Sequence, residues 1–147
     1  MSLPEILSVM EIREFTSDYA ANNLLLDREE FSDTFITLCR DLAVSSYNEI
    51  PPMSVATFSN FPSKSTLLWG TLYHMFNGKS MLYARNNMSY SDGGVQINVE
   101  EKYQLYETLA QNAQAQFQTS ASRMKAYFNM ESGWGGVNSD DASLPMV

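Results

Sequence analysis

The sequence predicts a mainly α-helical fold: a bundle of about four helices, with a short β-turn and strand corner near residues 89–99 and an extended C-terminal arm. Two observations predict the helices: apolar residues recur at helical spacing, and serines stand at N-cap positions. The corner is predicted by the turn Asp92-Gly93-Gly94, which is followed by the alternating segment Val95-Gln96-Ile97. We therefore expect the chain to reverse direction there, between its two longest helices.

The first helix is predicted from a capping box near the N-terminus. Ser8 is followed three residues later by Glu11, a spacing in which each side chain can bind the other residue's backbone N–H. A narrow apolar stripe at helical spacing then runs through Phe15. The apolar run over residues 24–27 comes next, and we expect it to pack as irregular chain or as a short turn.

The second helix has the clearest start signal in the chain. Ser32 stands as an N-cap after the apolar Phe31, which can pack against Ile36 as a hydrophobic staple. The helical pattern continues to about Asn48. Pro51-Pro52 then ends the helix, because proline lacks a backbone N–H and restricts the residue before it.

A third helix follows a loop over residues 53–62, and Ser63 or Ser65 can cap it. In the loop, Phe58 and Phe61 are expected to anchor the chain on the core. Apolar residues occur nearly all the way round the third helix. Such a helix is buried on several sides, either centrally in the domain or against a neighbouring subunit.

Two glycines inside the third helix indicate a close contact. Gly70 and Gly78 each cost about 1 kcal/mol relative to alanine in a helix. We expect another backbone to approach the helix at these positions, because a glycine leaves room for it.

The fourth helix is predicted over residues 99–128, with Asn98 as its N-cap and Glu101 three residues further on. Its length would be about 45 Å at 1.5 Å per residue. Glutamines fill its outer face, which suits contact with several neighbours; plain solvent exposure is the alternative. Arg123 and Lys125 are expected to complement the dipole of this helix near its end.

At 147 residues the chain has the size of one domain, which we divide into a helical domain over residues 1–132 and an arm over residues 133–147. Trp134 is flanked by glycines and is interpreted as an anchor that docks on another surface. The alternative is that Trp134 folds back on its own domain. No run reaches the roughly 18 apolar residues of a membrane span, and no signal peptide is apparent, so we expect no membrane partner and cytosol-like surroundings.

The net charge of −8 argues against free binding to nucleic acid, which needs a basic surface. The excess of negative charge lies mainly in residues 1–60, which carry ten acids and three bases. Residues 61–147 carry seven acids and six bases. A charged partner of the N-terminal half would therefore be basic, or else this half is simply solvated.

No group of residues predicts catalysis, a cofactor or a metal site. His74, the single histidine, is expected to be a packed or half-exposed helix residue rather than a base or a ligand. Cys39 lies on the apolar stripe of the second helix and is expected to be an inert, buried thiol. Gly93-Gly94 precedes a strand, which is the wrong order for a phosphate-binding loop. We therefore expect no enzyme.

A series of apolar, turn and proline segments covers residues 24 to 136, most of the chain. The segments are Leu24-Leu25-Leu26-Asp27, Glu30-Phe31-Ser32-Asp33, Asp41-Leu42-Ala43-Val44, Tyr47-Asn48-Glu49, Pro51-Pro52, Phe61-Pro62-Ser63, Leu67-Leu68-Trp69-Gly70, the stretch from Arg85 to Gly94, Lys102-Tyr103 and Lys125-Ala126-Tyr127-Phe128-Asn129. In these segments the chain resembles the head-to-tail connector or neck adaptor proteins of tailed bacteriophages. The first twenty and last ten residues lie outside the resemblance.

The resemblance implies a structural virion protein without enzymatic activity, which forms a homo-oligomeric ring, commonly of twelve copies, and joins the portal protein to neck or tail proteins. DNA would pass through the channel without sequence-specific binding, since an acid-rich wall repels phosphate. The protein would lie in the neck region of the virion, and in the host cytoplasm before assembly. The alternatives are another virion ring component, of the tail-completion or baseplate kind, and a small cytosolic helical interaction module.

The resemblance also implies where subunits and partners would make contact. The corner would project as a contact loop, with Arg85 at its base facing an acid of the next copy. The C-terminal arm would dock on the portal protein or on an adjacent subunit. The candidate interface residues are Arg85, Asn86, Tyr90, Asp92, Gly93, Gly94, Trp134, Leu144 and Val147.

Overall fold

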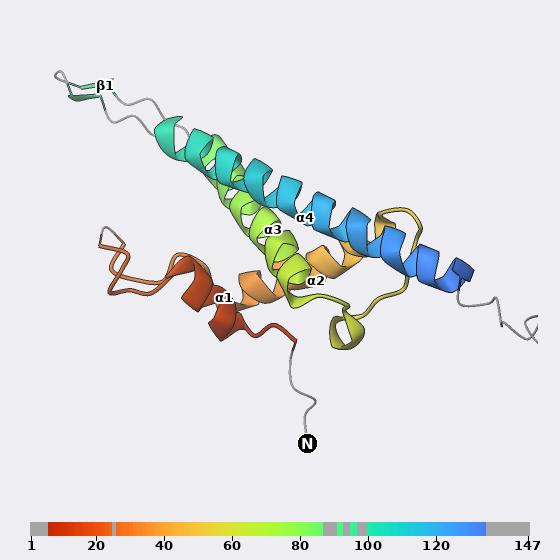
Figure 1. Cartoon of the computed structure of the whole chain (residues 1–147). Helices are drawn as coiled ribbons and strands as arrows, with labels where there is room; N and C mark the ends of the chain where they lie inside the picture. Colours follow the sequence, from red (N-terminus) through yellow and green to blue (C-terminus); the bar gives the residue numbers. More distant parts are fainter. Residues whose placement is uncertain (1–5, 25, 87–90, 93–94, 97–99, 135–147) are drawn as a thin grey trace, which may run out of the picture.

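The computed structural model is mainly helical, as predicted (Figure 1). It describes residues 6–24, 26–86, 91–92, 95–96 and 100–134. Within this part of the chain the α-helices are α1 (Val9–Thr16), α2 (Asp33–Glu49), α3 (Lys64–Arg85) and α4 (Glu100–Trp134), and a short 3-10 helix, η1, spans Phe58–Asn60. Between α3 and α4, the two-residue strands β1 (Ser91–Asp92) and β2 (Val95–Gln96) pair in antiparallel fashion.

The starts of the first three helices follow the predicted caps. The Ser8 hydroxyl accepts the N–H of Glu11, whose carboxylate accepts the N–H of Ser8, so the capping box is present. Ser32 caps α2, and Ser63 rather than Ser65 caps α3. The predicted cap of α4, Asn98, lies outside the described residues.

The helix α3 is the centre of the fold, because it packs against α2 on one side and against α4 on the other (Figure 1). The chain reverses direction after α3, and α4 returns beside it and continues past its beginning. The buried apolar residues of the core come mainly from these three helices: Ile36, Cys39, Ala43, Tyr47, Leu67, Leu72, Met75, Ala113, Phe117 and Ala121. Phe31 and Phe61 join this core from the connecting segments, as predicted for the staple and the loop anchor, and Leu7 and Ile12 join it from α1 and the segment before it.

The two glycines of α3 do lie at close contacts, but the groups that approach them are side chains. A Cβ atom at Gly70 would lie 2.8 Å from the ring of Phe117 on α4 and 2.9 Å from the Cβ atom of Ala43 on α2. A Cβ atom at Gly78 would lie 2.7 Å from the ring of Phe35. The expected approach of another backbone is therefore wrong, and aromatic rings fill the space instead.

Buried Arg13 attaches α1 and the segment after it to α2. Its guanidinium donates to the carboxylate of Asp18 at 3.0 Å, to Asp33 Oδ1 at 2.5 Å and to the carbonyl of Phe31 at 2.7 Å. Asp18 is also buried, and its carboxylate accepts the backbone N–H groups of Glu30 at 2.7 Å and Phe31 at 3.0 Å. This network, together with the buried ring of Phe31, fixes the irregular chain between α1 and α2.

Buried Lys125 holds the end of α2 against α4. Its ammonium donates to the carbonyls of Ile50 at 2.6 Å and Pro52 at 2.8 Å, and to Ser54 Oγ at 2.9 Å. Burial lowers the pKa of Lys125. The expectation that Lys125 complements the dipole of its own helix is wrong, since its charge meets carbonyls after the C-terminus of α2 instead.

The end of the fourth helix differs from the expectation. The fourth helix runs to Trp134, so Gly133 and Trp134 belong to α4 and not to the predicted arm over 133–147. The rest of that arm lies outside the described residues. The expectation of a short turn over residues 24–27 is confirmed at Leu24 and Leu26, and 89% and 40% of these residues are exposed.

Replacing Gly70 with alanine should lower the free energy of unfolding by about 1–2 kcal/mol. Alanine is the better helix former by about 1 kcal/mol, but the added methyl group would overpack the contact with Phe117 and Ala43. The control is Gly133→Ala in α4, where nothing lies within 4 Å, so stability should stay constant or rise slightly. Urea unfolding measures both variants, and equal responses would contradict the packing argument.

Replacing Lys125 with methionine should destabilise the protein by about 1–2 kcal/mol, because the stem is kept but three partly buried acceptors lose their charged donor. The matched control is Arg123→Met, two residues earlier on the exposed side of the same helix, which should change stability by at most about 0.5 kcal/mol. Chemical denaturation followed by circular dichroism compares them. If the Lys125→Met variant were as stable as the wild type, the ammonium would make no net contribution to the free energy of unfolding.

Candidate subunit interface

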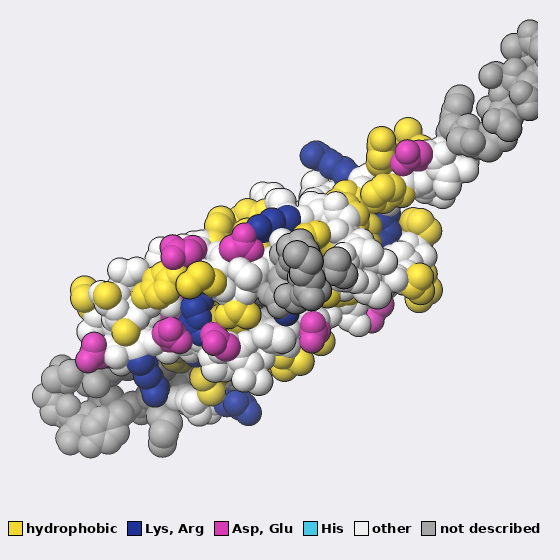
Figure 2. All heavy atoms as spheres, turned by 90° about the horizontal axis from the view of Figure 1, so that it is seen from below, with side chains coloured by type: hydrophobic (Ala, Val, Ile, Leu, Met, Phe, Trp, Pro, Cys, Tyr) yellow, Lys and Arg dark blue, Asp and Glu magenta, His cyan; other side chains and the backbone are white. Residues whose placement is uncertain are grey.

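The C-terminal end of α4 is largely exposed, and its Phe128, Asn129 and Ser132 line a hollow together with the segment that follows α2. Every residue from 126 to 133 is exposed, and we call residues 126–134 the α4 tip. The tip carries large apolar side chains: Tyr127 is 62% exposed, Phe128 45% and Met130 61%. Figure 1 shows α4 extending past the other helices, and Figure 2 shows hydrophobic side chains at this narrow end of the molecule. Exposed apolar side chains gathered in one place are typical of a contact surface.

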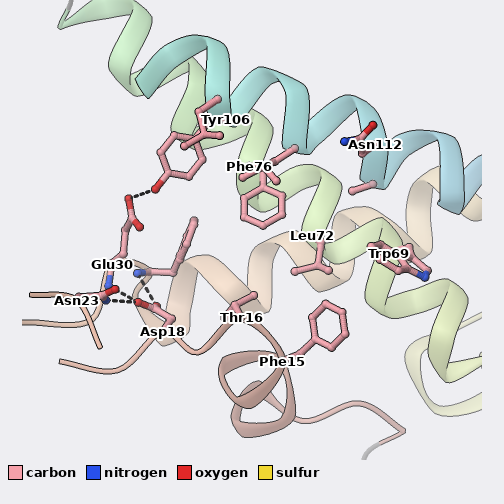
Figure 3. A pocket seen from close by; sticks show the side chains of 14 residues that line it. Phe15, Thr16, Asp18, Asn23, Glu30, Trp69, Leu72, Phe76, Tyr106 and Asn112 are labelled. Carbon is pink, nitrogen blue, oxygen red and sulfur yellow. Dashed lines mark hydrogen bonds between the residues drawn. The ribbon is translucent and has the colours of Figure 1, made fainter. Parts of the chain in front are cut away.

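A second open apolar surface is a groove of about 390 Å³ between α1 with its following segment and the adjoining faces of α3 and α4 (Figure 3). Its apolar walls are formed by Phe15, Phe31, Trp69, Leu72, Phe76, Leu105, Leu109 and Ala113. The rings of Phe15 and Trp69 meet edge to face at 5.9 Å and join α1 to α3 along this wall. The groove lies near the beginning of α4, far from the α4 tip along the same helix.

The rim of the groove is apolar and open to solvent. Phe15 is 55% exposed, Leu105 57% and Leu109 36%. A neighbouring hollow shares Leu105 with the groove and adds Leu24 and Leu26, which are 89% and 40% exposed. The apolar surface therefore continues from the groove across the turn that follows α1.

The charged residues that line the groove are two carboxylates, Asp18 and Glu30. Asp18 is tied to Arg13 and to backbone N–H groups, as described above. Glu30 Oε1 accepts the hydroxyl of Tyr106 at 2.6 Å and that of Tyr83 at 3.3 Å. Burial, together with Glu30, raises the pKa of both tyrosines, so both remain protonated donors at neutral pH. Glu30 thereby links the segment before α2 to α3 and α4 through these two hydrogen bonds.

The predicted interface residues fall at two separate places in the structure. Arg85 is exposed in the last turn of α3, and Asn86 is its exposed C-cap, whose N–H donates to the Leu82 carbonyl at 3.1 Å. Asp92 lies in β1 opposite Val95, beyond the ends of α3 and α4, whereas Trp134 is the last residue of α4 at the other end of the molecule (Figure 1). Tyr90, Gly93, Gly94, Leu144 and Val147 lie outside the described residues.

The groove and the exposed tip were missed by reasoning from sequence. The groove joins residues from α1, α3 and α4 that have no common spacing in the chain. The tip was missed because the apolar pattern of the fourth helix was ended at Phe128. A signal was present, since Arg123, Tyr127, Met130 and Trp134 continue the helical spacing of i, i+4, i+7 and i+11.

The residues considered for chemistry lie in helix contacts. Ser46 Oγ and His74 Nε2 are 3.0 Å apart and link α2 to α3, and burial lowers the pKa of His74. Cys39 is buried, which raises the pKa of its thiol to about 12 and leaves it unreactive at neutral pH. In the part of the chain that the structure describes, no three His, Cys, Asp or Glu residues are placed to hold a metal ion, and no helix is long and apolar enough to cross a membrane.

Comparisons with known proteins add no relative to this description. A scan against protein-family models, a search of curated proteins and a search of solved structures each found no match. The resemblance to head-to-tail connector proteins stays a prediction from the quoted segments. The groove and the tip are what the structure adds to it.

The free energy of unfolding should fall as the pH drops from 7 to 5, in part because of His74. The pKa of the buried imidazole is lowered from 6.5, so the unfolded chain binds the proton first and gains stability relative to the folded state. His74→Gln should reduce this slope. Ser46→Ala, which keeps the imidazole, should retain most of it, since burial is the cause of the shift. Urea unfolding at pH 7, 6 and 5 tests this, and an unchanged slope in His74→Gln would rule out a contribution from the imidazole.

Proposed function

We propose that this chain is a structural virion protein, a head-to-tail connector (adaptor) subunit. In this role several copies form a ring that joins the portal protein to the neck or tail, and packaged DNA passes through its channel. The sequence segments quoted above suggest this class, and the helical fold suits it. The protein would be made in the host cytoplasm and would reside in the neck of the virion.

The observation that carries the proposal is the amount and distribution of uncovered apolar surface. Fourteen large apolar side chains of the described residues are exposed, and where such side chains are neighbours they form the kind of apolar patch that marks an interaction site. They include the α4 tip and the rim of the groove, which lie toward opposite ends of a long helix (Figure 1). A ring subunit contacts two neighbouring copies as well as the proteins above and below it, so it requires several separate surfaces.

The charge distribution supports a passive relation to DNA. The net charge is −8, and residues 1–60 contribute ten acids against three bases. On the face seen in Figure 2, Asp and Glu side chains are interspersed with Lys and Arg and do not leave a continuous basic stripe. A surface of this kind repels phosphate or does not bind it, so DNA can slide past without sequence-specific binding.

The chain's chemistry-bearing residues favour a structural role over an enzymatic one. The distance of 3.0 Å between Ser46 Oγ and His74 Nε2 would suit a nucleophile and its general base. Both residues lie on packed helices, however, and neither lines the groove. The carboxylates that do line the groove, Asp18 and Glu30, are occupied by hydrogen bonds that hold the fold together.

If the proposal is correct, omitting this chain during virion assembly should leave DNA-filled heads and free tails that do not join. Supplying the wild-type chain in trans should restore joined particles, which negative-stain electron microscopy can count. Cryo-EM of the restored particles should place the chain in a ring beneath the portal. Normal joining without the chain would overturn the proposal. Density at the baseplate or the tail end would assign the chain to another ring of the virion.

A further inference from the structure

The segment that follows α2 places three oxygen atoms around the head group of Lys125. The backbone carbonyls of Ile50 and Pro52 accept hydrogen bonds from Lys125 Nζ at 2.6 and 2.8 Å. Ser54 Oγ accepts the third hydrogen bond at 2.9 Å. The ring of Tyr47 faces the same nitrogen, with its centroid 4.6 Å away. We call these three oxygens and the ring the oxygen cradle.

Asn48, in the last turn of α2, holds the cradle in shape by hydrogen bonds that do not involve Lys125. Its side-chain carbonyl accepts the hydroxyl of Ser54 and the backbone N–H of Ala56, each at 2.9 Å. Its side-chain amide donates to the carbonyl of Ala56 at 2.8 Å, and its backbone carbonyl accepts the N–H of Ser54 at 3.2 Å. Because Ser54 gives its hydroxyl proton to Asn48, its oxygen can only accept from Lys125. The cradle is therefore a preformed group of acceptors.

The chemistry of the cradle suits a primary ammonium ion. An ammonium group on a carbon stem has three N–H donors, which matches the three oxygens. The face of an aromatic ring also attracts a cation, and the Tyr47 ring takes this position. Divalent metal ions such as Mg²⁺ and Ca²⁺ are usually held by carboxylates, whereas all three oxygens of the cradle are uncharged.

A hollow of about 210 Å³ lies beside the cradle and opens to solvent. The segment after α2, α4 and the tip of α4 line it together, through Tyr47, Pro52, Met53, Ser54, Lys125, Phe128, Asn129 and Ser132. A small ion can therefore reach the cradle from solvent once the lysine side chain is shortened.

From this geometry we propose that the oxygen cradle is a binding site for a primary ammonium ion, and that Lys125 is its tethered occupant. Attachment to α4 gives the lysine a much higher effective concentration than a free ion has, so the lysine fills the site in the native chain. When the side chain is shortened, a free ammonium ion takes its place and restores the link between α2 and α4. The inference goes beyond the proposed function and does not depend on it, because the binding requires no other protein.

Chemical rescue of Lys125→Ala tests the site. The variant removes the ammonium and most of the stem, which leaves room for methylammonium, the head group of lysine as a free ion. Urea unfolding at pH 7 is measured in sodium chloride and in methylammonium chloride at the same ionic strength. With about 0.3 M methylammonium and a dissociation constant of about 0.1 M, the equilibrium constant for unfolding should fall about fourfold. The wild type should show no comparable change, since its site is filled.

Lys125→Met is the matched control, because its side chain occupies the space of the lysine stem and blocks the site. Methylammonium should therefore not stabilise this variant. Tetramethylammonium carries the same charge but has no N–H donor, so it should not stabilise Lys125→Ala. Adding Ser54→Ala to Lys125→Ala removes one of the three oxygens and should weaken the response to methylammonium several-fold.

Each result decides for or against the proposal. If Lys125→Ala is unfolded in sodium chloride, circular dichroism should show that methylammonium restores its helices. No response of Lys125→Ala to methylammonium, whether the variant is folded or unfolded, would overturn the proposal. An equal response of Lys125→Met, or an equal effect of tetramethylammonium, would attribute the stabilisation to a general salt effect and would also overturn it. An undiminished response without the Ser54 hydroxyl would place the bound ion outside the cradle, with the same consequence.

Discussion

The close approach of α2 and α4 to α3 at Gly70 is the constraint on which the rest of the structure depends. The ring of Phe117 and the Cβ atom of Ala43 both occupy the space that a side chain at this position would fill. Because α3 is covered from two sides there, three helices supply most of the apolar core, to which Leu7 and Ile12 add from α1 and the segment before it. Polar contacts then add to this apolar attachment of the remaining parts.

Buried cations provide that attachment at two places. Arg13 joins α1 and the turn after it to α2 through Asp18 and Asp33, and Lys125 joins the end of α2 to α4 through backbone carbonyls. In both cases a long side chain reaches groups that are far away in sequence and satisfies several of them at once. The groove lies where α1 and its following segment, held to α2 by Arg13, face α3 and α4.

The sequence was sufficient for the local parts of the fold. Ser8, Ser32 and Ser63 mark helix starts by the chemistry of their own side chains, which depends on neighbours three residues away. The partners of Arg13 and Lys125 could not be predicted in the same way. Lys125 and Ile50 are 75 residues apart in the chain, and no local sequence pattern indicates that they form a hydrogen bond. Gly70 shows an intermediate case: its presence indicated a close contact, whereas the identity of the contacting group, a ring, depended on the three-dimensional arrangement.

The unequal lengths of the two long helices connect the fold to its proposed role. The helix α4 has 35 residues and α3 has 22, so α4 is longer than its main packing partner by about 20 Å at 1.5 Å per residue. An exposed helix end gains little stability from its own hydrogen bonds, because most helical stability in proteins comes from packing an apolar face. The extra turns nevertheless carry Tyr127, Phe128 and Met130, which are unfavourable in water and contribute nothing to the chain's own core. An exposed apolar helix end of this kind is accounted for if it packs against another molecule. A subunit of an assembly makes such contacts, which agrees with the proposed role.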